Sequence, residues 1–155
     1  MFLKENQDGS IKGRGVVDER KQRKKIAPKD ATSPKVSIEA VILTATIDAL
    51  DGRYVTVVDM QGAYLSADMG DEVHVVFRGA LSEMMVAADP ALYWPFVSYE
   101  TENPVLYVWL YKALYVCLKS ALLFYEKLVG DLEAYGFKIN PYDPCMANNM
   151  IGGKH

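Results

Sequence analysis

The sequence predicts an α+β fold in which helices and short strands are both present. Two segments repeat apolar residues with the three-to-four-residue spacing of a helix, and several short β-branched runs have the composition of strands. Gly, Pro, Asp and Asn separate these segments as turn residues do. With 155 residues, 50% of them hydrophobic, the chain is long enough to bury the core of one domain.

The first 36 residues form a basic N-terminal segment, distinct from the body at 37–155. Residues 1–35 hold ten Lys and Arg against five Asp and Glu, whereas residues 36–155 hold seven against fifteen. The glycine residues near the N-terminus predict a loop or a hairpin. Pro28 and Pro34 are expected to keep the following backbone extended. Such a segment suits contact with polyanions, and a solvated, partly disordered arm is the alternative.

The first helix is expected after Ser37, which has the side chain of a helix N-cap. Its apolar positions follow helical spacing, and Asp51 and Gly52 end it; these positions are Ile38, Val41, Ile42, Ala45 and Ala49. The β-branched run at 54–58 is then too short for a helix. Because nearly every residue in it is apolar, we expect a strand covered on both faces that ends at Asp59.

Further elements follow in order. The pattern predicts a strand at 73–77, a helix at 80–88 closed by Asp89 and Pro90, an aromatic loop at 93–99 and a strand at 105–110. A strong helix is expected at 119–135, with Gly136 as its C-terminal stop. One face of it is apolar, formed by Ala121, Tyr125, Leu128, Val129, Leu132 and Tyr135. A turn at 140–144, a strand at 145–151 and a Gly-Gly hairpin turn at 152–153 complete the prediction.

Several classes of protein are excluded. No apolar run approaches the roughly 18 to 20 residues that span a bilayer, and the N-terminus has no signal peptide, so we expect a soluble, intracellular protein that is neither secreted nor bound to a membrane. Cys117 and Cys145 lie far apart and fit core positions better than a disulfide framework or a zinc site. With only His74 and His155, the chain has no set of residues for Ser-His-Asp or Cys-His catalysis.

Asp59 is the most informative candidate for chemistry. A carboxylate at the end of an apolar strand needs solvent, a metal ion or a positive partner to offset its desolvation. A strand-end Asp that caps the turn through Gly62 is the structural alternative.

The residues around Asp59 resemble the first catalytic motif of reverse transcriptases. Residues 54–66 read YVTVVDMQGAYLS, a hydrophobic strand that ends in Asp, with an Ala-aromatic pair four and five residues later. Several further motifs, in order, resemble the copia-type retrotransposon polymerase. They are a Lys-x-Arg at 12–14 with Gln22 and Ser33-Pro34 after it, GDEVHVVF at 70–77, LYKALYV at 110–116, FYEKL at 124–128 and Gly136-Phe137 with Asp143-Pro144-Cys145.

This resemblance implies the fingers and a partial palm of an RNA-directed DNA polymerase. Asp59 would bind the catalytic Mg²⁺ ions, and the backbone carbonyl of Met60 would add a ligand. The backbone amides of Gln61, Gly62, Ala63 and Tyr64 would lie beside the triphosphate. The ring of Tyr64 would act as a steric gate that favours deoxynucleotides, although an ordinary core aromatic explains the same residue.

The same resemblance implies binding partners. An RNA template, a DNA primer and deoxynucleoside triphosphates are expected, together with the rest of the polymerase if it is encoded elsewhere. Arg14 and Lys21 are the candidates for phosphate contacts in the fingers. Tyr115, Val116 and Lys119 belong to the motif that contacts template and nucleotide.

The sequence also departs from the family. It contains no Asp-Asp pair, which the family supplies on a hairpin downstream, so we expect a chain truncated before that hairpin and without polymerase activity. Val116 stands where the family usually has Gly, and Leu122 where it usually has Arg. A non-catalytic nucleic-acid-binding or interaction module and a non-functional gene fragment therefore remain alternatives.

Overall fold

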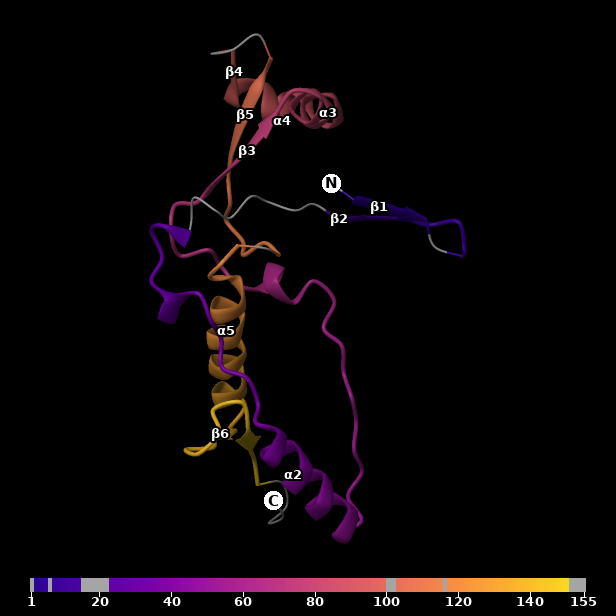
Figure 1. Cartoon of the computed structure of the whole chain (residues 1–155), viewed down its shortest axis with the longest axis vertical. Coiled ribbons are helices and arrows are strands. Elements are labelled where there is room, and N and C mark those ends of the chain that lie inside the picture. The colour runs from indigo at the N-terminus through magenta and orange to yellow at the C-terminus, as the bar shows by residue number, and fades with distance from the viewer. Residues whose placement is uncertain (1, 6, 15–22, 100–102, 116, 151–155) are drawn as a thin grey trace.

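The computed structural model describes residues 2–5, 7–14, 23–99, 103–115 and 117–150. These residues form helices and small antiparallel sheets, so the predicted α+β class is confirmed. Most of the elements lie along one long axis (Figure 1). Along this axis lie a three-stranded sheet with two helices at one end, a long helix in the middle and another helix at the other end.

The three-stranded sheet has the order β3-β5-β4, with all pairs antiparallel. Its strands are β3 (His74–Arg78), β5 (Val105–Trp109) and β4 (Val97–Ser98). In the register of β3 and β5, His74 lies opposite Trp109 and Arg78 opposite Val105. The strands predicted at 73–77 and 105–110 are therefore confirmed to within a residue.

Helices connect the strands of this sheet. α3 (Ala80–Ala88) agrees with the predicted helix. The Asp89 carboxylate accepts a hydrogen bond from the Leu92 N–H (3.1 Å) and so caps the next helix, α4 (Pro90–Tyr93). The aromatic stretch predicted as a loop is more ordered than expected. It contains part of α4, the 3₁₀ turn η3 (Trp94–Phe96) and β4, because Pro at a first helical position and an Asp cap both favour a helical turn.

The N-terminal segment begins with a hairpin. β1 (Phe2–Glu5) pairs antiparallel with β2 (Ile11–Arg14), and Gly9 adopts the positive φ (78°) that a tight turn accepts. Figure 1 shows this hairpin to one side of the long axis. A short 3₁₀ turn, η1 (Pro28–Asp30), follows before the first long helix.

α2 (Ile38–Leu50) confirms the predicted helix and its cap, since the Ser37 hydroxyl accepts a hydrogen bond from the Ala40 N–H (3.1 Å). Its apolar side chains are nevertheless exposed, with Ile38 at 74% and Leu50 at 81%. None of the residues of α2 is buried. Helical periodicity thus predicted the helix correctly, but no part of the described chain covers its apolar face.

The strand expected at 54–58 is wrong. These residues are extended but belong to no strand, and Tyr54 and Val57 are 102% and 92% exposed. A strand needs a neighbour for its backbone groups and cover for its faces, and within the described ranges no segment provides either. The β-branched composition therefore produces an extended segment and not a sheet.

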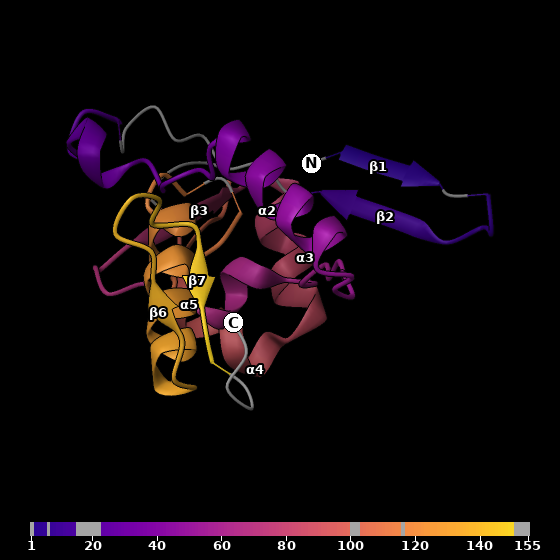
Figure 2. The same ribbon diagram turned by 90° about the horizontal axis from the view of Figure 1, so that it is seen from below.

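α5 (Ser120–Ala134) confirms the second long helix, and Gly136 ends it with a φ of 87°. Its predicted apolar face is half-buried apart from Tyr135, which is 80% exposed. Seen from below, β6 (Lys138–Ile139) and β7 (Ala147–Asn148) lie beside this helix (Figure 2). β7 is much shorter than the strand predicted at 145–151, and residues 151–155, with the Gly-Gly turn, lie outside the described residues.

The core consists of two small clusters. One surrounds the start of α5 and contains Ala67, Met69, Ala113, Cys117 and Ser120. The other lies between the β3–β5 pair and α3 and contains Val75, Ser82, Val105 and Leu106. Both cysteines are free, as predicted; Cys117 is buried and Cys145 is half-buried. Among the helices described, none combines the length and the apolar character that a membrane crossing needs.

Asp143 ties the C-terminal turn to the start of α2. Its carboxylate accepts hydrogen bonds from the backbone N–H of Ser37 (2.9 Å) and of Cys145 (2.9 Å). These hydrogen bonds, that from Ser37 first, hold the pKa of Asp143 below its usual 3.8. Because the folded-state pKa is lowered, this stabilisation is present above the ordinary pKa and is lost as the pH falls through the lowered one.

We expect Asp143→Asn to reduce the protection of the Ser37 and Cys145 amides against hydrogen exchange at neutral pH, since an amide side chain has only one acceptor oxygen. In the unchanged protein the same protection should fall only below about pH 3.8. Amide exchange followed by NMR measures both effects, with Asp131→Asn as an exposed control. Equal protection in Asp143→Asn and the unchanged protein would contradict this role.

Candidate functional site

Two segments that are distant in sequence meet at the centre of the molecule. Residues 67–69 pair with residues 111–113: the Ala113 N–H donates to the Ala67 carbonyl (2.9 Å), and the Met69 N–H donates to the Tyr111 carbonyl (2.9 Å). Next to them the Leu110 N–H donates to the Val73 carbonyl (2.9 Å), which continues the β3–β5 ladder. Residues 70–72 lie between these pairings and bulge out of the ladder.

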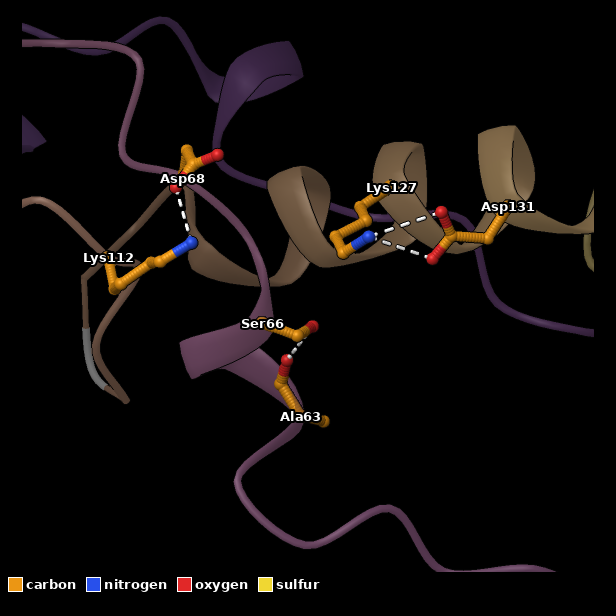
Figure 3. Close-up of polar contacts among 6 residues, drawn as sticks. All are labelled: Ala63, Ser66, Asp68, Lys112, Lys127 and Asp131. Atoms are coloured by element: carbon orange, nitrogen blue, oxygen red, sulfur yellow. Dashed lines mark hydrogen bonds and ion pairs between the residues drawn. The ribbon is translucent and has the colours of Figure 1, made fainter.

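Two ion pairs reinforce this junction. The Lys112 ammonium contacts the Asp68 carboxylate (2.5 Å), as Figure 3 shows, and the Lys119 ammonium contacts that of Asp71 (2.5 Å) in the bulge. The hydrogen bond that Lys112 donates lowers the pKa of Asp68, and the hydrogen bond that Lys119 donates to Asp71 raises the pKa of Lys119. Both pairs are partly exposed, so they orient the segments more than they stabilise them.

An aromatic cluster forms at the same junction. The ring of Tyr64, in the 3₁₀ turn η2 (Ala63–Ser66), lies 5.6 Å from that of Tyr115, centroid to centroid, at a tilt of 37°. It lies 6.1 Å from the ring of Phe124 in α5 in an edge-to-face arrangement (84°). Both geometries are favourable for aromatic pairs. Tyr64 thus contacts one residue of the LYKALYV stretch, Tyr115, and one residue of the FYEKL stretch, Phe124.

Local hydrogen bonds fix the turns that carry these rings. Gly62 adopts a left-handed conformation (φ 64°) directly before η2, and the Ser66 hydroxyl donates to the Ala63 carbonyl (2.6 Å; Figure 3). On the other side, the buried Ser120 hydroxyl donates to the Leu114 carbonyl (2.7 Å). The glycine is needed here because other residues rarely adopt this φ.

The predicted site residues therefore fall into two groups. Ala63 and Tyr64 are half-buried at the junction, whereas Asp59, Met60 and Gln61 are exposed on the extended segment before it. The described residues contain no group of three potential metal ligands. Asp59 supplies one carboxylate, which is fewer oxygen ligands than Mg²⁺ takes in a protein site, so the residues described here do not form a complete magnesium site.

The remaining candidates are distributed differently. Tyr115 contacts Tyr64, and Lys119 is paired with Asp71. Arg14 lies at the end of β2. Lys21 and Val116 lie outside the described residues.

Sequence reasoning did not select Asp68, Asp71 and Lys112, although the ion pairs make them part of the junction. Asp71 and Lys112 stand within the two motifs already noted, GDEVHVVF and LYKALYV. Their opposite charges were a usable signal. The pairing itself could not be foreseen, because it depends on the register of two segments 44 residues apart.

We expect Tyr64→Ala to lower the free energy of unfolding by about 2 kcal/mol, because it removes two ring contacts and the apolar area they cover. Tyr64→Phe keeps the ring and should change stability little. Urea denaturation followed by circular dichroism measures the effect, with Tyr135→Ala, an 80% exposed aromatic, as the matched control. If Tyr64→Ala costs no more than Tyr135→Ala, the ring cluster does not hold the junction.

Comparisons with known proteins do not assign the chain to a family. No protein-family model matches it, and neither a curated protein nor a solved structure is found to be similar. The described residues form a mixed α+β structure whose central junction joins two distant segments.

Proposed function

We propose that this chain is the fingers and part of the palm of a copia-type reverse transcriptase, an RNA-directed DNA polymerase. One observation carries the proposal. The stretch after Asp59 and the LYKALYV stretch, which resemble two separate polymerase motifs, pack against each other through Tyr64 and Tyr115. Motifs that build one nucleotide site must meet in space, so this contact supports the proposal.

In this proposal Tyr64 selects the sugar of the incoming nucleotide. A steric gate requires a ring of fixed orientation, and the contacts with Tyr115 and Phe124 supply that restraint. Asp59 lies five residues earlier, exposed on the segment that leads into η2. It would contribute one oxygen ligand to the metal, and we assign no step of nucleotidyl transfer to this chain alone.

The basic N-terminal segment would hold phosphates of the template, the primer or the deoxynucleotide. Arg23, Lys24 and Lys25 are exposed in the part of the segment that the structure describes. The same charges favour the second candidate function, a non-catalytic nucleic-acid-binding module. The third alternative, a non-functional gene fragment, draws support from the uncovered segment at 54–58, and a cooperative thermal unfolding transition would count against it.

We expect the protein to bind an RNA–DNA primer–template, and the affinity to fall about 40-fold between 50 and 200 mM salt if about three phosphates are neutralised. Fluorescence anisotropy of a labelled primer–template measures the affinity. Replacing Arg23, Lys24 and Lys25 by Ser should weaken binding and flatten the salt dependence, because fewer counterions are released.

The control variant replaces three exposed cations of the body, Arg53, Arg78 and Lys138, by Ser, and so changes the net charge equally. It should retain most of the affinity. Equal losses in the two variants would show that overall charge, and not the N-terminal segment, determines binding. Binding that does not respond to salt would exclude phosphate contacts.

Primer extension by the purified chain is expected to be absent, because the sequence has no Asp-Asp pair to join Asp59 in a two-metal site. Incorporation of labelled deoxynucleotides on an RNA template with Mg²⁺ is the measurement. Template-dependent incorporation that is lost in Asp59→Ala would refute the predicted inactivity, although it would support the family.

A further inference from the structure

An aromatic pocket lies at the far end of the molecule from α2, against the three-stranded sheet. Its volume is about 530 Å³, within the range of small-molecule sites. Two aliphatic residues, Leu92 and Val108, line it together with six side chains that carry rings. These are His74, Tyr93, Phe96, Tyr107, Trp109 and Tyr111.

Three of the rings form a row, in which His74 and Trp109 are stacked across the strands and Trp109 and Tyr111 are tilted. His74 and Trp109, which are opposite each other in the β3–β5 register, have centroids 6.4 Å apart and an interplanar angle of 24°. Trp109 and Tyr111 follow at 4.9 Å and 31°. The row remains accessible, with Trp109 47% and Tyr111 71% exposed. A flat ligand can therefore lie against ring faces that are already ordered.

The charges around the pocket favour a cation. No Lys or Arg lines it, and residues 80–110 contain none. Asp89 places an exposed carboxylate at its rim, where it accepts the N–H of the lining residue Leu92 (3.1 Å). The cations nearest along the chain, Arg78 and Lys112, are not among the residues that line it. The Lys112 ammonium pairs with Asp68, and Arg78 stands opposite Val105 at the end of β3.

We propose that this pocket binds a planar aromatic cation. Ring faces carry negative electrostatic potential and attract cations, while their area favours stacking of a flat ring system. The Asp89 carboxylate adds attraction at the rim, and the same charge disfavours phosphate-bearing ligands. The pocket shares Tyr111 with the junction, where the backbone carbonyl of this residue is used, but its rings are not those of the Tyr64 cluster. The proposal does not depend on the function proposed for the junction.

The test uses three ligands of one shape and different charge: N-methylacridinium, neutral acridine at pH 8 and acridine-9-carboxylate. The chain has two tryptophans, so Trp94→Phe leaves Trp109 as the single reporter of binding by fluorescence quenching. We expect N-methylacridinium to bind about tenfold more tightly than the carboxylate, with acridine between them. Equal affinity for all three ligands, or tighter binding of the anion, would overturn the proposal.

Two substitutions separate charge from stacking. Asp89→Asn keeps a good helix cap and should weaken N-methylacridinium about threefold while leaving acridine unchanged. Glu126→Gln, an exposed acid on α5, is its control. Tyr111→Leu should weaken N-methylacridinium about threefold by removing a ring, whereas Tyr142→Leu, at a 95% exposed tyrosine, should have no effect.

The titrations are repeated over a range of protein concentrations, with sedimentation velocity of the unliganded chain. A monomer with an unchanged affinity supports an open pocket. Self-association that removes the quenching would overturn the proposal, because the rings would then form a contact between copies. Loss of quenching in both Tyr111→Leu and Tyr142→Leu would also overturn it, since binding would then not be specific to the pocket.

Discussion

The pairing of residues 67–69 with residues 111–113 is the interaction on which the rest of the structure depends. It extends the β3–β5 ladder toward α5, and so connects the sheet at one end of the molecule with the long helix in the middle (Figure 1). The bulge at 70–72 brings Asp71 to Lys119 at the start of that helix. Several of the buried residues gather here, including Ala67, Met69, Ala113 and Cys117. Small and sulfur-containing side chains allow the two backbones to approach closely.

This junction also explains the form of the candidate site. Tyr64 is restrained because η2 directly precedes one of the paired segments and Tyr115 lies two residues after the other. Asp59 has no comparable restraint, since the segment before η2 contacts no strand in the described part of the chain. A ring in a fixed position and a carboxylate on an uncovered segment are consistent with part of a site. They do not amount to a complete catalytic arrangement.

Exposed apolar surface is a further feature of this elongated fold. The apolar residues of α2 and of the segment at 54–58 face solvent, which is unusual for so many large side chains in a folded domain. The aromatic pocket differs from these surfaces because three of its rings form a row and its walls come from both a sheet and short helices. Charge separates the parts of the molecule further. The basic N-terminal segment suits phosphate, while the acidic aromatic end suits a cation.

The sequence by itself determined the local elements. Helical spacing together with Ser37 and Gly136 located α2 and α5 almost to the residue, because caps and periodicity act over a few neighbouring positions. The β-branched composition of short runs located β3 and β5 to within a residue. It failed at 54–58, where β-branched composition shows only that a segment favours extension. Whether such a segment becomes a strand depends on a neighbour that local pattern does not contain.

Only the tertiary structure decided which motifs meet. The sequence indicated Asp59 and Tyr64 together, yet the structure restrains the second and leaves the first exposed. The ion pairs of Asp68 and Asp71 and the row of rings of His74, Trp109 and Tyr111 depend on strand register across tens of residues. Register is determined by the combined packing and hydrogen bonding of both strands, and no local pattern in either strand specifies it alone.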